Sequence, residues 1–169
     1  MNPRVRFAFI AVGLFLVQMT FVPLIPVAGY TPDLLIFWLV AVGIRRGRLE
    51  ATLGGFLIGL LHDLTTTQFL GLAALSKSIA GYAAGAFYNE NTAEQTLGSY
   101  RFVLTTLLLS LLHNAVYYGV FYQGVADSVI IASATTTVGT TIYTTIAAVL
   151  PMFWFSRRFR TYSPVVMTR

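Results

Sequence analysis

The sequence ATLGGFLIGLLHD, residues 51–63, has a small or acidic residue at every fourth position. These positions are Ala51, Gly55, Gly59 and Asp63. They share one face of a helix because an α-helix returns to the same side after about 3.6 residues. Small residues at this spacing let two helix backbones approach closely, which is how helices associate in lipid. The stretch therefore predicts a helix packed tightly against another helix inside a membrane.

The composition of the whole chain agrees with a protein embedded in lipid. Of its 169 residues, 56% are hydrophobic and 10% are charged, and the mean hydropathy is +0.73. An ordinary soluble domain carries roughly 25% charged residues. Spans of about 20 apolar residues leave room for about six crossings and for no separate soluble domain. The predicted fold class is an all-α polytopic membrane protein, with a single transmembrane domain over residues 1–169.

Apolar runs bounded by proline, glycine and charged residues give six predicted transmembrane helices. The first run ends at Pro23, because proline blocks helix continuation. The second run begins with a typical helix start: Thr31 offers a capping hydroxyl, Pro32 suits the first helical position, and Asp33 places an acid in the first turn. The sixth run is long enough to tilt, or to kink at Pro151. The predicted spans cover residues 7–22, 32–45, 50–64, 71–88, 101–122 and 127–155.

Positive charge is distributed asymmetrically over these spans. When the spans alternate in direction, ten of the eleven basic residues fall on one side: Arg4, Arg6, Arg45, Arg46, Arg48, Arg101, Arg157, Arg158, Arg160 and Arg169. The eleventh, Lys77, lies within a span. Loops rich in Lys and Arg stay in the cytoplasm, so both termini and the loops at 45–49 and 89–100 are predicted to be cytoplasmic. The net charge of +5 is then a topology signal, and no nucleic-acid partner is predicted.

Glycines in the fourth span repeat the spacing of four, at Gly81 and Gly85. The pattern leaves two alternatives for these residues and for Gly55, Gly59 and Asp63. They pack helices within the bundle, or they form a direct contact with a different protein. A row of hydroxyl residues in the sixth span has the same spacing, at Ser133, Thr137, Thr141 and Thr145.

Asp63 and Lys77 are charges within the spans that need a partner. An unpaired charge in a bilayer costs from about 2.5 kcal/mol upward. The short connection between the third and fourth spans places Lys77 about two helical turns below the outer loop. We therefore predict an ion pair between Asp63 and Lys77; the alternative is that Lys77 extends its charged end to the outer interface. Asp33 and His62 are possible contacts on the outer side.

His113 and Asn114 lie in the middle of the fifth span and are predicted to be buried polar residues. Two histidines on different helices, without a cysteine or a carboxylate cluster, predict no metal site. The sequence also lacks a phosphate loop, a nucleophile elbow and the H-E-x-x-H and C-x-x-C motifs. We therefore predict no catalytic residues and no cofactor, and a protein that is not an enzyme.

Five short stretches, taken in order, resemble the family of the bacterial rod shape-determining protein MreD. They are PDLL at 32–35, RRG at 45–47, GGFLIGLLHDL at 54–64, LGLAAL at 70–75 and GY at 81–82. Their order, their spacing and the total length fit that family, and the resemblance is concentrated in residues 30–90. His62 and Lys77 depart from the usual pattern.

The resemblance implies a non-catalytic scaffold subunit of the elongation (rod) complex, or elongasome. That complex directs lateral peptidoglycan synthesis and cell shape from the bacterial inner membrane. MreC, a single-span protein with a periplasmic domain, is the implied principal partner. The RodA glycosyltransferase and a class B penicillin-binding transpeptidase are implied in the same complex. The resemblance also implies a six-helix bundle similar to the substrate-binding subunits of vitamin (energy-coupling factor) transporters.

Two other classes of function are alternatives. A transporter subunit that captures a vitamin-like small molecule would use an outer pocket lined by Tyr30, Asp33, His62 and Asp63. An intramembrane protease or acyltransferase would need a catalytic pair that the sequence does not show. Native mass spectrometry separates the first alternative from a scaffold, because a transporter subunit would carry a small molecule and a scaffold a co-purified membrane protein.

Overall fold

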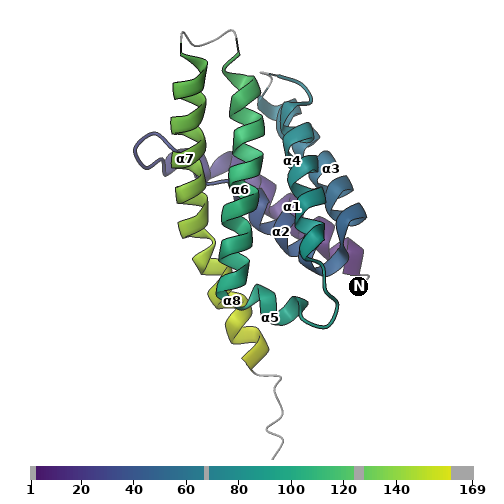
Figure 1. Cartoon of the computed structure of the whole chain (residues 1–169). Helices are drawn as coiled ribbons and strands as arrows, with labels where there is room; N and C mark the ends of the chain where they lie inside the picture. Colours follow the sequence, from purple (N-terminus) through teal and green to yellow (C-terminus); the bar gives the residue numbers. More distant parts are fainter. Residues whose placement is uncertain (1–2, 67–68, 124–127, 161–169) are drawn as a thin grey trace, which may run out of the picture.

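The computed structural model describes residues 3–66, 69–123 and 128–160, which form an all-α arrangement (Figure 1). Two of the loops predicted to face outward, near 64–70 and 123–127, are described only in part, without residues 67–68 and 124–127. The tail at 161–169, with Arg169, also lies outside the described residues. Short 3-10 helices at Val22–Leu24 and Gly85–Phe87 follow the first and fourth α-helices. The α-helices are α1 (Pro3–Thr20), α2 (Leu34–Arg46), α3 (Arg48–Thr66), α4 (Leu72–Ala84), α5 (Ala93–Leu97), α6 (Tyr100–Phe121), α7 (Val129–Ala147) and α8 (Val149–Arg160).

Helix α2 is the central element. Every residue from Leu35 to Ile44 is buried, and the helix contacts α1, α3, α4, α5 and α6. Its sequence is apolar around the whole circumference, as expected for a helix enclosed on all sides. The helix begins at Leu34 because Asp33 is its N-cap: Oδ1 of Asp33 accepts a hydrogen bond from the Leu35 amide at 2.9 Å. The predicted start at residue 32 was two residues early.

The glycine rows pack α3 against α4, two helices that lie side by side in Figure 1. A Cβ atom added at Gly55, Gly59, Gly81 or Gly85 would overlap backbone atoms of the facing helix. Without side chains at these positions, the two backbones come into direct contact, as in other small-residue interfaces in lipid. These glycines therefore face the interior of the bundle, in contact with the backbone of a neighbouring helix.

A single residue joins α2 to α3. Gly47 has φ +81°, a left-handed conformation that glycine adopts at little cost. Its amide donates to the carbonyl of Gly43 at 3.0 Å and so closes the end of α2. The chain reverses direction here, and the arginines on both sides of Gly47 are held at one end of the bundle.

Three stretches of the described chain are long and apolar enough to cross a membrane. They match the first, fifth and sixth predicted spans, at Val5–Leu24, Tyr100–Phe121 and Val129–Arg157. Helices α2 and α4 have 13 residues each, about 20 Å of length. That is shorter than a hydrocarbon core of about 30 Å, and the other helices surround much of their surface.

The structure differs from the sequence prediction at two places in the second half of the chain. A short helix, α5, lies within the predicted loop at 89–100 and buries Ala93 and Leu97. The predicted sixth span is interrupted at Ala148, between α7 and α8 and three residues before the predicted kink at Pro151. Pro151 has no N–H to donate to the carbonyl four residues earlier, so the hydrogen-bond ladder is broken just before it.

Candidate functional site

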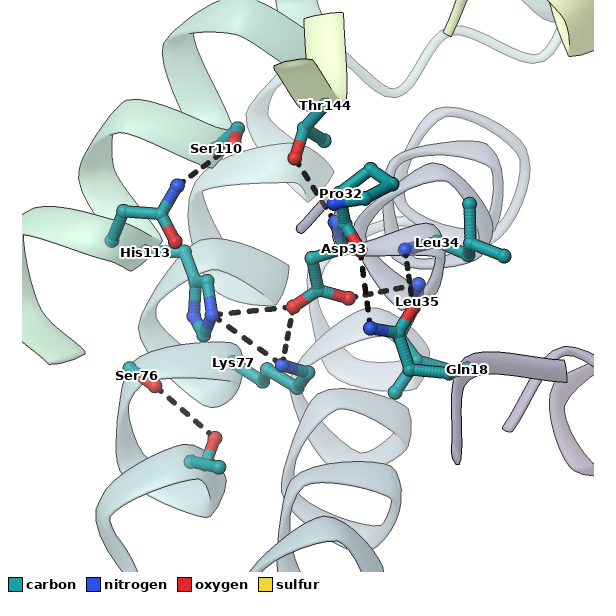
Figure 2. Close-up of polar contacts among 12 residues, drawn as sticks. Gln18, Pro32, Asp33, Leu34, Leu35, Ser76, Lys77, Ser110, His113 and Thr144 are labelled. Carbon is teal, nitrogen blue, oxygen red and sulfur yellow. Dashed lines mark hydrogen bonds and ion pairs between the residues drawn. The ribbon is translucent and has the colours of Figure 1, made fainter. Parts of the chain in front are cut away.

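A buried polar cluster joins α2, α4 and α6 at the centre of the bundle (Figure 2). The ammonium Nζ of Lys77 lies 2.7 Å from Oδ2 of Asp33. Nε2 of His113 lies 3.4 Å from the same carboxylate oxygen and 3.4 Å from Nζ of Lys77. One residue from each of three helices therefore meets at a single carboxylate oxygen.

Other helices close the cluster around Asp33. The amide of Asp33 donates to Oγ1 of Thr144 on α7 at 3.0 Å. From α1, Gln18 accepts a hydrogen bond from the Leu34 amide at 2.8 Å and donates to the Pro32 carbonyl at 3.1 Å. The start of α2 is thus fixed by α1 on one side and by α7 on the other, as Figure 2 shows.

The charged side chains of the cluster are buried. Lys77 is 1% exposed and is the largest fully buried side chain among the described residues. A buried ammonium is tolerated when a carboxylate neutralises it and hydrogen bonds satisfy the remaining atoms. Asp33 supplies that carboxylate and is itself 9% exposed. The predicted contact of Asp33 on the outer side of the membrane stays a prediction; within the bundle, its side chain is occupied by Lys77 and His113.

The ion pair of Lys77 differs from the predicted one. Asp63 accepts three backbone hydrogen bonds at the start of α4, from the amides of Gly71 at 3.0 Å, Ala73 at 2.9 Å and Ala74 at 3.0 Å. The first amides of a helix have no partner within the helix and carry partial positive charge. Asp63 therefore compensates a helix terminus, and the predicted Asp63–Lys77 pair is replaced by the pair of Asp33 with Lys77.

Asn114 links α6 to α7 next to the cluster. Its amide Nδ2 donates to Oγ1 of Thr141 at 3.0 Å and to Oγ of Ser110 at 3.2 Å. The hydroxyl of Thr137 donates to the Asn114 carbonyl at 3.2 Å. Asn114 is 2% exposed, and His113 beside it is 4% exposed. Two members of the hydroxyl row, Thr137 and Thr141, thus make hydrogen bonds across the α6–α7 contact, a modest source of helix association in lipid. Ser133 and Thr145 instead donate to carbonyls of their own helix.

A polar cavity of about 200 Å³ lies against the cluster. Its lining includes Asp33, His62, His113 and Tyr117 together with Gln18, Thr31, Pro32, Asn114, Tyr118 and Thr140. Nδ1 of His62 is buried and has no hydrogen-bond partner in the structure. Of the four residues expected to line a ligand pocket, Asp33 and His62 contribute to this cavity, and Tyr30 and Asp63 do not.

Sequence reasoning missed the roles of Gln18 and Thr144 in this cluster. A signal for Gln18 was present, because a lone amide in the apolar span at 7–22 needs a hydrogen-bond partner. No comparable signal marked Thr144, which is one of many hydroxyl residues in α7. Among the described residues, no group of three or more His, Cys, Asp or Glu side chains is arranged to hold a metal ion.

Comparison with known proteins identifies the family to which this bundle belongs. The model of the rod shape-determining protein MreD family matches residues 4–161, nearly the whole chain. Neither a curated protein nor a solved structure shows a significant match. Because the family match spans every described helix of the bundle, the chain belongs to the rod shape-determining protein MreD family.

Proposed function

We propose that this protein is a non-catalytic scaffold of the rod complex in the bacterial cytoplasmic membrane. Membership of the MreD family implies a role in determining rod shape. In this proposal the chain crosses the membrane six times with both termini in the cytoplasm, and it holds MreC. The RodA glycosyltransferase and a class B penicillin-binding transpeptidase, which belong to the same complex, supply the chemistry of lateral peptidoglycan synthesis.

The family match carries this proposal, and the buried cluster supports it. Asp33, Lys77 and His113 contact one another within the bundle, and their neighbours on α1 and α7 fix the start of α2. Charges used in this way hold helices together, which is what a scaffold requires of its interior. The packed glycines restrict where a partner binds, because α3 and α4 cover each other's small-residue faces.

Capture of MreC from native membranes tests the proposal. The tagged chain is expressed at its normal level in a rod-shaped host, and the complex is extracted in mild detergent and quantified by mass spectrometry. We expect MreC to be enriched well above an unrelated multi-span protein carrying the same tag. Recovery of MreC at the level of that control would overturn the scaffold proposal.

The polar cavity favours one second candidate function, the capture of a small polar molecule. Its volume of about 200 Å³ is below the roughly 300–1,000 Å³ of sites for drug-sized ligands, so any ligand would be small. This candidate matches the likeness to vitamin transporter subunits that the family resemblance implies. Native mass spectrometry of the gently released protein decides it: a bound small molecule supports ligand capture, and a spectrum with detergent adducts alone rejects it.

A further inference from the structure

An apolar groove of about 580 Å³ runs between α1 and α3. Trp38 of α2 forms its floor, and Gly54 makes room for the indole, since a Cβ there would lie 2.8 Å from the ring. Nε1 of Trp38 donates to the Phe7 carbonyl at 3.0 Å, so the polar atom of the floor already has a partner. Leu53 and Leu57 stand along one wall and are 55% and 65% exposed.

One end of the groove is lined by Arg46 and Glu50. The guanidinium carbon of Arg46 lies 5.4 Å from the centre of the Phe7 ring, and that of Arg45 lies 5.9 Å from the same centre. Nε of Arg46 is 3.8 Å from Glu50, a contact that engages one of the five N–H donors of a guanidinium. A second groove of about 580 Å³ lies on the other side of Phe7 and is lined by Arg45 and Glu94, whose side chains pair at 3.1 Å. Each of the two grooves therefore has an arginine in its lining, Arg46 in the first and Arg45 in the second.

The length of the groove matches one leaflet of a bilayer. Its wall on α3 extends from Leu49 to Leu61, about 18 Å of helix, and half of the hydrocarbon core is about 15 Å. A helix of that length and about 10 Å in diameter occupies on the order of 1,400 Å³. The open groove of about 580 Å³ would hold only one side of such a helix, whereas its length suits an extended acyl chain, which is a thinner rod.

We propose that this groove is a binding site for an anionic phospholipid, with one acyl chain along Trp38 and the phosphate at Arg46. The apolar walls match the chain, and the guanidinium group of Arg46 matches the negative headgroup, as in basic pockets between transmembrane helices that hold acidic lipids. The lipid belongs to the leaflet on the arginine side, which is the cytoplasmic leaflet in the proposed orientation. The site is independent of MreC capture and of the polar cavity.

The test uses the full-length protein exchanged into equal amounts of phosphatidylglycerol and phosphatidylcholine, with retained lipids counted by native mass spectrometry. We expect the wild type to retain more phosphatidylglycerol. Arg46→Gln should lower that preference by about fivefold, the effect expected for one basic residue at a membrane surface. Arg48→Gln is the matched control, because Arg48 is exposed at the same end and contacts Tyr82 rather than the groove.

A second pair of variants tests the apolar part of the site. Ala8 lines the groove and is exposed, so Ala8→Phe should fill it and reduce retention of both lipids. Ala134→Phe places the same bulk at an exposed position of α7 and should change nothing. Equal retention of the two lipids by the wild type overturns the proposal. So does an equal effect of Arg46→Gln and Arg48→Gln, which would indicate a diffuse surface charge. A photoreactive residue at Leu53 that captures a protein helix instead of lipid also rejects it.

Discussion

Lys77 is a buried charge whose partners come from other helices of the bundle. Its ammonium group is buried, and it is neutralised by a carboxylate 44 residues earlier in the sequence. That carboxylate also caps α2 and lies against His113, so a change at one of these residues alters the surroundings of the others. The short connection between α3 and α4 suggested Asp63 as the partner. Sequence spacing shows which residues are near along a hairpin, but not which oxygens are already occupied by helix-terminal amides.

The Asp33–Lys77 pair makes the first prediction. Lys77→Met leaves a buried carboxylate without its cation, and Asp33→Asn leaves a buried ammonium, so each should lower the free energy of unfolding by about 3–5 kcal/mol. The double variant removes both charges and should cost clearly less than the sum. Unfolding of the four proteins in detergent micelles gives the coupling through a double-mutant cycle. A coupling within error of zero would show that the pair does not form.

The second prediction concerns Asp63 and distinguishes capping of α4 from an ion pair with Lys77. Asp63→Ala removes the acceptor of three amides at the start of α4 and should destabilise the protein by about 1–3 kcal/mol. Asp63→Asn keeps one acceptor oxygen and should cost less. Combined with Lys77→Met, either change should be additive, because the two side chains have different partners. Strong coupling in the same unfolding assay would instead restore Asp63 as the partner of Lys77.

At the scale of elements, the sequence predicted the positions of helices and turns well where one feature, such as glycine spacing or a long apolar run, marked them clearly. The glycine spacing predicted the packed helix α3, and arginines around Gly47 marked the turn between α2 and α3. The long apolar helices α1 and α6 lie close to their predicted spans. Helix α5 was missed because its five residues are too few for a periodic pattern. The interruption at Ala148 was placed late because proline affects the hydrogen bond to a residue four positions before it.

The α3–α4 contact makes the third prediction. Gly55→Leu and Gly59→Leu should sharply reduce the amount of folded protein, because leucine would force two touching backbones apart. Gly13→Leu on α1 is the matched control, since nothing lies within 4 Å of a Cβ built there. Size-exclusion chromatography of a fluorescent fusion measures folded yield, and MreC capture is expressed per folded molecule. That ratio should stay constant; a normal yield with lost capture would mean that this glycine face binds the partner.

On the scale of the whole molecule, the turn between α2 and α3 places three arginines at one end of α3, and the polar cavity lies near the other end of that helix. Arg45, Arg46 and Arg48 flank the turn at Gly47, where α2 ends and α3 begins. His62 and the cavity lie at the opposite end of α3. This polarity of the fold agrees with the orientation proposed from the charge asymmetry, in which basic residues remain in the cytoplasm.

Orientation is the fourth prediction and is measured with paired reporters. An alkaline phosphatase fusion, active in the periplasm, should be inactive at residue 169 and active at residue 124. A green fluorescent protein fusion, which folds in the cytoplasm, should give the reverse pattern. Phosphatase activity at residue 169 would mean that the six-span topology is wrong.

The Asp33–Lys77 pair also bears on how the protein is made. Synthesis starts at the N-terminus, so Asp33 has left the ribosome 44 residues before Lys77 does. When the lysine enters the translocon, its counter-charge has already been synthesised and is available to pair with it. His113 and Thr144 arrive afterwards on α6 and α7. Both charges of the pair are therefore synthesised before the second half of the bundle that surrounds them.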